Sequence, residues 1–208
     1  MSKPVSAPTT IEDMYAQQGL SPIAGVDEAG RGSLVGPVVA CAVILPQGLI
    51  INGVNDSKKL SPQRREELAT RIKENALAYA FGVVGVDTIE EINILHASLL
   101  AMKIAVEGLT IAPKMVLFDG IKLPVGLPCE AVCIKQGDSA SHLIAAASIL
   151  AKVERDKMML ELHEQYPMYG FDRHKGYGTA AHKAALLEHG LCPQHRIGFC
   201  SGHKKNKR

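Results

Sequence analysis

The chain has 208 residues, of which 47% are hydrophobic and 21% charged, an ordinary composition for one globular domain. This composition excludes a disordered chain, a collagen-like rod and a small disulfide-stabilised scaffold. The formal net charge is +2, and four positive charges lie in residues 203–208, so the body of the chain gives no argument from bulk charge for a nucleic-acid partner.

No segment is typical of a membrane span or a secretory signal. The longest mostly apolar run, residues 34–45, is interrupted by Gly36 and Pro37, whereas a membrane-spanning helix needs about 20 apolar residues. The first residues lack the apolar centre of a secretory signal. We therefore expect a cytoplasmic protein with no membrane partner. Its five cysteines include no Cys-x-x-Cys pair and are expected to be free thiols.

The first half of the chain predicts two strands, a helix and a third strand. Residues 1–21 have no clear periodicity and are expected to form a tail or a short irregular helix. The short apolar runs 23–26 and 38–45 are predicted strands joined by a glycine-rich loop. Ser61 is the expected N-cap of a helix, and another strand is predicted at residues 79–86.

The second half predicts long helices between short strands. A helix is expected at residues 87–109, followed by strands at 115–118 and 130–134. Residues 141–165 predict a long helix with a buried, nearly all-apolar first half and an amphipathic second half. A last helix is expected at residues 180–189. Strands mixed with long helices predict an α/β domain in which helices cover the sheet.

Acidic side chains follow three of the predicted strands, where a glycine begins to turn the chain. Asp27 and Glu28 follow the first strand, Asp119 the fourth and Asp138 the fifth. Ligands of open α/β sheets bind outside strand ends, so neighbouring parallel strands would bring these four carboxylates together. Crowded carboxylates need compensating charge, and oxygen ligands favour Mg²⁺ or Mn²⁺ over zinc. A paired-metal site of this kind suits displacement at a phosphodiester.

Two conditions apply to this interpretation. Successive residues of a strand point to opposite faces, so Asp27 and Glu28 can both face a metal only if the strand has ended by Glu28. Aspartate before glycine is also common at ordinary turns, which leaves the alternative that each acid forms a turn or a cap. The recurrence at three strand ends weakens this alternative without excluding it.

The glycine-rich segment after the first strand does not match a nucleotide-binding loop. A phosphate loop would need lysine and then serine or threonine where Arg31 and Gly32 stand after Gly30. A dinucleotide fingerprint fails too, because Val35 occupies the place of its third glycine. What remains is an exposed backbone that a ligand can approach closely.

Basic residues cluster in two loops. Lys58 and Lys59 precede the first predicted helix, and Lys175 precedes the last. Lysine and nearby hydroxyl groups suit phosphate positioning, although a solvated surface is the alternative for both loops. Tyr177 stands between two glycines, where its ring could stack on a sugar or a base.

The motifs, taken in chain order over about residues 23–197, closely resemble those of ribonuclease HII. The matching segments are Gly25-Val26-Asp27-Glu28-Ala29-Gly30-Arg31-Gly32, Asp56-Ser57-Lys58-Lys59-Leu60, Asn93-Ile94-Leu95-His96-Ala97, Asp119-Gly120, Gly137-Asp138, Ala146-Ala147-Ser148-Ile149-Leu150-Ala151-Lys152 and His174-Lys175-Gly176-Tyr177. The resemblance implies a ribonuclease H-like mixed five-stranded sheet flanked by helices, with a helical C-terminal lobe. It divides the chain into an N-terminal extension (1–21), a catalytic domain (22–198) and a basic tail (199–208).

The resemblance also implies an activity. The family cuts the RNA strand of RNA–DNA hybrids and cuts DNA at embedded ribonucleotides, leaving a 3′-hydroxyl and a 5′-phosphate, with Mn²⁺ or Mg²⁺ as cofactor. The expected partners are thus RNA–DNA hybrids and ribonucleotide-containing duplex DNA, bound by a monomer. Two alternatives stay open: a nuclease or recombinase of the same sheet type without a ribose requirement, and a hybrid-binding module without catalysis.

Site residues carry over motif by motif. The candidate catalytic and metal-binding acids are Asp27, Glu28, Asp119 and Asp138. The residues expected to sense the 2′-hydroxyl and pack against the same nucleotide are Gly30, Arg31, Gly32 and Tyr177. The expected contacts to the substrate backbone are Lys58, Lys59, Ser148, Lys152 and Lys175. The basic residues 203–208 lie outside the resemblance and are expected to tune affinity for nucleic acid.

Overall fold

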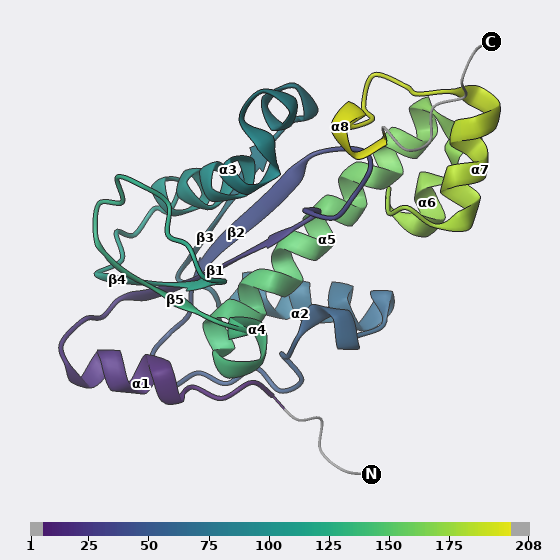
Figure 1. The fold of residues 1–208 in the computed structure, drawn as a ribbon. Coiled ribbons are helices and arrows are strands. Elements are labelled where there is room, and N and C mark those ends of the chain that lie inside the picture. The colour runs from purple at the N-terminus through teal and green to yellow at the C-terminus, as the bar shows by residue number, and fades with distance from the viewer. Residues whose placement is uncertain (1–5, 201–208) are drawn as a thin grey trace.

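Five strands form one mixed sheet in the computed structural model, which describes residues 6–200 (Figure 1). The strands are β1 (Ile23–Ala29), β2 (Val38–Ile44), β3 (Ala78–Val84), β4 (Met115–Asp119) and β5 (Glu130–Ile134). Their order across the sheet is β3-β2-β1-β4-β5. β1 runs parallel to β4, and β4 runs parallel to β5, whereas β2 is antiparallel to both of its neighbours. The predicted mixed five-stranded sheet is confirmed, and the carboxyl ends of β1, β4 and β5 meet at the same end of it.

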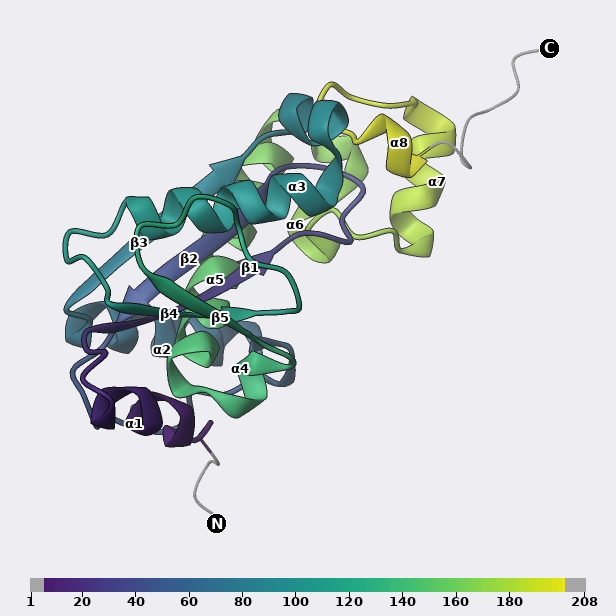
Figure 2. The same cartoon turned by 60° about the vertical axis from the view of Figure 1, so that its left-hand side comes forward.

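Helices cover both faces of the sheet (Figure 1, Figure 2). They are α2 (Pro62–Asn75), α3 (Val86–Glu107) and α5 (His142–Gln165). The residues of β1 alternate between the two layers: Ala24 and Val26 pack in the core under α3, while Ile23 and Ala29 pack in the core under α5. Because both faces are covered, the neighbouring strand β2 is buried at every position.

The long helix α5 begins and is buried as the sequence predicts. Its N-cap is Ser141, whose hydroxyl accepts a backbone hydrogen bond of the first turn. Residues 143–151 are all buried, whereas the second half buries only the stripe formed by Arg155, Met159 and Leu162. The charged member of this stripe is important for the site described below.

The C-terminal half of α5 extends beyond the sheet and carries a helical lobe (Figure 1). The other elements of the lobe are η2 (Pro167–Tyr169), α6 (Phe171–His174), α7 (Ala180–His189) and α8 (Ile197–Cys200). Val35, from the loop after β1, packs with Met159 and Phe171 in the apolar core of this lobe. The predicted helical lobe is confirmed, and it binds the loop between β1 and β2.

The N-terminal segment forms a regular helix, α1 (Thr10–Gln17), instead of a tail or an irregular helix. Its Glu12 is buried at the start of α5, where Oε1 accepts hydrogen bonds from the Ser141 hydroxyl (2.7 Å) and the Leu143 N–H (2.9 Å). A carboxylate is favoured at a helix N-terminus by the partial positive charge there. The helix was hard to predict because the residue that it buries, Glu12, is polar and adds nothing to an apolar pattern.

A kink divides α3 at Asn93, where the sequence predicted a continuous helix. The φ of Asn93 is +64°, outside the helical range. Its Oδ1 accepts hydrogen bonds from the N–H groups of Leu95 (3.0 Å) and His96 (3.3 Å). Asn93 therefore caps the part of α3 that follows the kink.

Three further sequence expectations concern membrane spans, the cysteines and the basic tail. Searched over the described residues, the helices include none with the length and apolar character of a membrane span. The five cysteines are free, and Cys41 is buried in β2. The basic residues 203–208 lie outside the described part of the chain.

Candidate active site

The register of the sheet places two of the predicted acids side by side. The parallel pairing of β1 with β4 ends with Val26 opposite Phe118, so Asp27 and Asp119 follow at the same level. β1 continues to Ala29 through its antiparallel pairing with β2. The edge of β1 that faces β4 is consequently free of a strand partner at its two acidic residues.

For Asp27 and Glu28 to face the same metal, the first strand had to end by Glu28, and this condition is not met. The strand continues to Ala29 because its pairing with β2 persists, so Asp27 and Glu28 point to opposite faces. Asp27 lies on the α5 face, where Ser148 opposes the rise of its pKa. Glu28 lines a cavity of about 340 Å³ on the α3 face, together with Asp119. The two carboxylates of β1 therefore approach its free edge from two sides.

Burial, together with neighbouring negative charge, raises the pKa values of three of the acids. Burial raises the pKa of Asp27 well above its ordinary value, and the charges of Glu28 and Asp119 raise it further. Burial also raises the pKa of Glu28, against the opposing effect of Arg31, whose Nη1 lies 3.3 Å from Oε1. Burial raises the pKa of Asp119 too, although a 2.7 Å hydrogen bond from the Gly137 N–H opposes the rise. Positive charge at this edge would stabilise all three ionised forms.

Asp138 reaches the same place from the turn after β5. It is buried in α4 (Gly137–Ala140), and its negative charge contributes to the raised pKa of Asp119. Lys58 Nζ lies 3.6 Å from Asp138 Oδ2. Burial lowers the pKa of Lys58, but the charges of Asp138 and Asp27 outweigh this effect and raise it. A lysine ammonium is thus directed at the carboxylates.

The chemistry of the donor set fits hard divalent cations, because it consists of carboxylate oxygens. Within residues 6–200, however, no three histidine, cysteine or acidic side chains are grouped closely enough to hold an ion. Each carboxylate is turned toward a protein group; these are Glu28 N–H for Asp27, Arg31 for Glu28, Gly137 N–H for Asp119 and Lys58 for Asp138. Metal binding would require these side chains to reorient, and it stays a prediction.

The glycines of the loop after β1 have different roles. Gly30 has a φ of +100°, and a Cβ atom there would lie 2.1 Å from Arg155 Nε. The fold itself therefore requires glycine at position 30. A Cβ atom at Gly32 would meet no protein atom within 4 Å. The space beside Gly32 is consequently open to a ligand.

A buried arginine of α5 holds this loop, and the sequence analysis missed it. Arg155 is 0% exposed, and its guanidinium donates to Pro37 O (3.0 Å), Val35 O (3.1 Å), Ser33 Oγ (2.8 Å) and Lys175 O (3.0 Å). Its place in the apolar stripe of α5 is a signal that could have identified it, since a charged residue in such a stripe needs buried partners.

A second buried arginine holds the loop from the opposite side. Arg196 Nη1 donates to Gly30 O (2.8 Å) and Arg31 O (3.1 Å), and its Nε and Nη2 donate to Gly36 O (3.0 and 2.8 Å). Burial lowers the pKa of Arg196 to about 10, which leaves it charged at neutral pH. Among residues 6–200, neither Arg196 nor Arg155 forms an ion pair with a carboxylate. Both guanidinium groups are used to fix backbone carbonyls.

Tyr177 lies against the same loop. An isolated β-bridge joins it to Ser33, and its ring is near Lys152 Nζ (5.4 Å from the centroid) and Arg155 Cζ (5.6 Å). The residue is 37% exposed. The structure thus brings together the aromatic residue and the glycine loop, which are far apart in the sequence.

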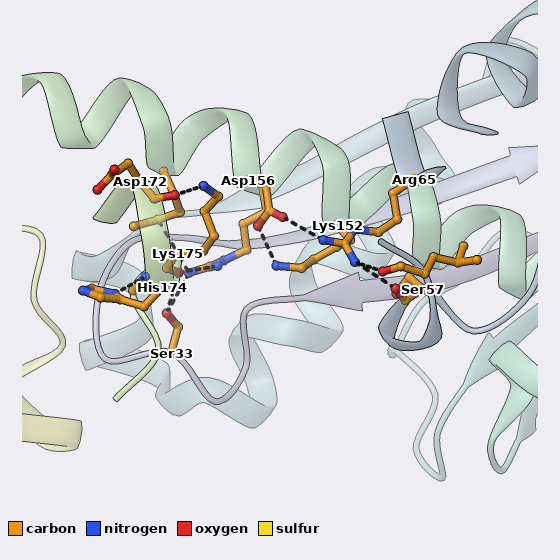
Figure 3. Close-up of polar contacts among 12 residues, drawn as sticks. Ser33, Ser57, Arg65, Lys152, Asp156, Asp172, His174 and Lys175 are labelled. Atoms are coloured by element: carbon orange, nitrogen blue, oxygen red, sulfur yellow. Dashed lines mark hydrogen bonds and ion pairs between the residues drawn. The ribbon is translucent and has the colours of Figure 1, made fainter. Parts of the chain in front are cut away.

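The predicted contacts to the substrate backbone are distributed over four places. Lys152 and Lys175 line one groove of about 590 Å³ with Tyr177, and Lys152 Nζ donates to Asp156 Oδ1 (2.6 Å) in the network of Figure 3. Lys175 donates to the carbonyl of Asp172. The other three candidates lie elsewhere: Ser148 beside Ser57 (2.8 Å), Lys58 beside Asp138, and Lys59 beside Asp56 (3.6 Å).

Comparison with known proteins agrees with this arrangement. The family model described as Ribonuclease HII matches residues 24–202. Ribonuclease HII of Geobacter sulfurreducens is 54% identical over 197 residues, covering 95% of this chain and 90% of the relative. The crystal structure of ribonuclease H2 from Pyrococcus horikoshii OT3 has a TM-score of 0.75 and 27% identity, with 88% of this chain and 99% of that chain covered.

A more distant structure shares the fold. Bst-RNase HIII, crystallised in complex with Mn²⁺, has a TM-score of 0.65 at 18% identity, and the match covers 81% of this chain and 62% of that chain. The assignment of the family rests on the closer matches, which span nearly the whole sequence. With its family model matched over residues 24–202 and a relative more than half identical, the chain belongs to the ribonuclease HII family.

Proposed function

We propose that this ribonuclease HII uses the four carboxylates at the free edge of β1 to hold two divalent cations, Mn²⁺ or Mg²⁺. As a ribonuclease HII, the chain is an endoribonuclease that cleaves the RNA strand of RNA–DNA hybrids and cuts DNA at embedded ribonucleotides. The observation that carries the metal proposal is the raised pKa shared by Asp27, Glu28 and Asp119, which bound cations would reverse. The Mn²⁺ complex of Bst-RNase HIII is consistent with this choice of metal.

The side chains around the carboxylates have distinct tasks. Bound cations supply the activation of the attacking water and the stabilisation of the leaving 3′-oxygen. Ser148, on the α5 face, favours the ionised form of the Asp27 carboxylate by lowering its pKa. Lys58, whose raised pKa keeps it charged, is placed to bind a substrate phosphate close to Asp138. The expected products carry a 3′-hydroxyl and a 5′-phosphate.

Recognition of the ribose is assigned to the loop and to Tyr177. The open space beside Gly32 allows a sugar to approach the backbone of Gly30, Arg31 and Gly32, whose amides and carbonyls can pair with a 2′-hydroxyl. Tyr177, held against this loop, offers a partly exposed ring for the same nucleotide.

Contacts to the substrate backbone are assigned to the remaining basic residues. Lys152 and Lys175 flank Tyr177 in its groove and suit phosphates of the same strand. Lys59, whose Nζ lies 3.6 Å from Asp56 Oδ2, is a further candidate for a phosphate contact. Four further points stay predictions: the monomeric state, the cytoplasmic location, the role of residues 203–208 and the domain limits. The helix α1 packs directly on the catalytic domain through Glu12.

Replacing Tyr177 by alanine should slow cleavage at a single embedded ribonucleotide more than cleavage of a continuous RNA–DNA hybrid. The hybrid offers neighbouring riboses as alternative registers, whereas a single ribonucleotide offers one. Single-turnover rates on both substrates in the same metal measure the difference, with Tyr177→Phe as the control that keeps the ring. An equal loss on both substrates would reduce Tyr177 to a packing residue.

Two further measurements on the wild type test the alternative functions. Cleavage of an all-DNA duplex would favour a nuclease without a ribose requirement. Binding without cleavage in Mn²⁺ would favour a binding module.

Replacing Gly32 by alanine should leave the melting temperature unchanged and slow the cleavage of a duplex with one ribonucleotide. The added methyl group meets no protein atom and obstructs only a ligand. Gly30→Ala is the matched variant, and it should also lower the melting temperature because of the positive φ and the clash with Arg155. Thermal melting and single-turnover cleavage separate the two effects. Wild-type cleavage by Gly32→Ala would show that no ligand approaches this backbone closely.

A further inference from the structure

Two histidines form a buried pair inside the C-terminal lobe, apart from the groups assigned above. His182 of α7 is 0% exposed, and His195 is 2% exposed. Their Nε2 atoms lie 3.1 Å apart. The rings of Phe171, Tyr169 and His174 surround them, so water is excluded from the pair.

The directions of the hydrogen bonds determine where the protons lie. The Cys192 N–H donates to His195 Nδ1 (3.0 Å), so a neutral His195 carries its proton on Nε2. That proton is donated to His182 Nε2, and His182 therefore carries its own proton on Nδ1. His182 Nδ1–H donates in turn to the carbonyl of Tyr177 (3.0 Å). A chain of hydrogen bonds thus runs from the amide of Cys192 to the backbone of Tyr177.

Both rings must be neutral for this chain to be complete. A second proton on either ring would place a donor opposite a donor. Burial lowers the pKa of both His182 and His195 to about 4, so both are neutral at the pH of ordinary assays. The neutral pair is therefore a rigid link with one arrangement of protons.

The two ends of the link contact the two parts of the proposed ribose site. At one end His182 fixes the carbonyl of Tyr177. At the other end His195 forms a β-bridge with Val35 and precedes Arg196, which holds the carbonyls of Gly30 and Gly36. The pair consequently connects the backbone of the tyrosine with the backbone of the glycine loop.

We propose that the His182–His195 pair is a positioning element that sets Tyr177 against the loop of residues 30–36 and thereby contributes to the recognition of a single ribonucleotide. The inference rests on the proposed role of Tyr177. Neither histidine contacts the carboxylates described above or acts on the reacting bond. Their effect is on the distance and orientation between Tyr177 and the loop.

The test compares two substrates for variants of one histidine. His182→Phe keeps the ring but removes both of its hydrogen bonds, and His182→Asn can place an amide N–H near the position of Nδ1. His182→Phe should lower kcat/KM at a single embedded ribonucleotide about five- to tenfold more than on a continuous hybrid, as expected when the neutral hydrogen bond that holds the Tyr177 carbonyl is lost. His182→Asn should recover most of this ratio. His189→Phe, on the same helix, is the matched control and should leave the ratio unchanged.

The outcomes separate this inference from the proposed function. If Tyr177→Ala changes the ratio between the two substrates and His182→Phe does not, the positioning role is wrong while the role of Tyr177 stands. If Tyr177→Ala leaves the ratio unchanged, the proposed role of the tyrosine fails and the inference fails with it. A merely structural role would lower the melting temperature of both His182 variants without altering the ratio.

The wild-type protein gives a measurement that does not depend on the folding of a variant. Imidazole ¹⁵N–¹H correlation spectra at neutral pH should show the proton of His195 on Nε2 and that of His182 on Nδ1. The opposite tautomers, or a protonated ring at neutral pH, would overturn the proposed link.

Discussion

Asparagine in place of Asp27 or Asp119 should reduce cleavage of a ribonucleotide-containing duplex by about 10³-fold or more while the fold survives. Each substitution removes one ligand charge from the proposed metal site. Metal-assisted stabilisation of the transition state contributes several kcal/mol, and a loss of ~1.4 kcal/mol slows the reaction tenfold. Single-turnover cleavage in Mn²⁺ and in Mg²⁺ measures the loss. Asp87→Asn, an exposed aspartate at the start of α3, is the matched control and should cleave normally.

In a metal chelator at neutral pH, Asp27→Asn should have a higher melting temperature than the wild type. The pKa of Asp27 in the folded protein lies above its unfolded value, so the native state favours the protonated carboxyl. This contribution to stability is present below the unfolded pKa and is lost as pH rises through the folded pKa. The raised pKa of Asp27 therefore destabilises the metal-free fold at neutral pH, and asparagine removes that effect.

Divalent cations should act in the opposite direction on the wild type. They should raise its melting temperature more at pH 8 than at pH 5, since only ionised carboxylates bind them. A clear drop in melting temperature for both Asp27→Asn and Asp119→Asn would reveal a structural role for these acids. Near-normal turnover of either variant with a native melting profile would refute the carboxylate site.

Methionine in place of Arg155 should lower the free energy of unfolding by about 3 kcal/mol or more, because each buried polar group left without its donor costs about 1–3 kcal/mol. The groups concerned are the carbonyls of Val35, Pro37 and Lys175 and the hydroxyl of Ser33. The desolvation of the guanidinium, which methionine avoids, offsets part of this loss. Cleavage of all substrates should fall as well, since the loop after β1 loses its support.

Urea denaturation with two companion variants isolates the cause. Arg155→Lys keeps the charge but lacks the planar arrangement of donors, so it should recover only part of the stability. Arg173→Met, at a side chain that is 85% exposed, should change the free energy of unfolding by less than about 0.5 kcal/mol. Wild-type stability of Arg155→Met would mean that the loop is held by packing instead of by these hydrogen bonds.

Local patterns in the sequence predicted most of the secondary structure. Apolar runs bounded by glycine or proline located the five strands, and the apolar stretch 143–151 predicted the buried half of α5. Two predictions failed where a distant partner decided the outcome. β1 continues to Ala29 because β2 pairs with it, and α1 is ordered although its buried position is the acidic Glu12.

The sequence by itself determined the α/β class, the family and the identity of the acidic residues, because strand periodicity and the short motifs around Asp27, Asp119 and Asp138 are local features of the chain. Only the tertiary structure revealed what holds the loop beside them. Arg155 and Arg196 bind backbone carbonyls of residues remote in the chain, with separations as large as 166 positions between Arg196 and Gly30. Every residue except proline has the same backbone donor and acceptor, so such partners leave no mark on the sequence, and only folding shows which carbonyls a buried side chain will meet.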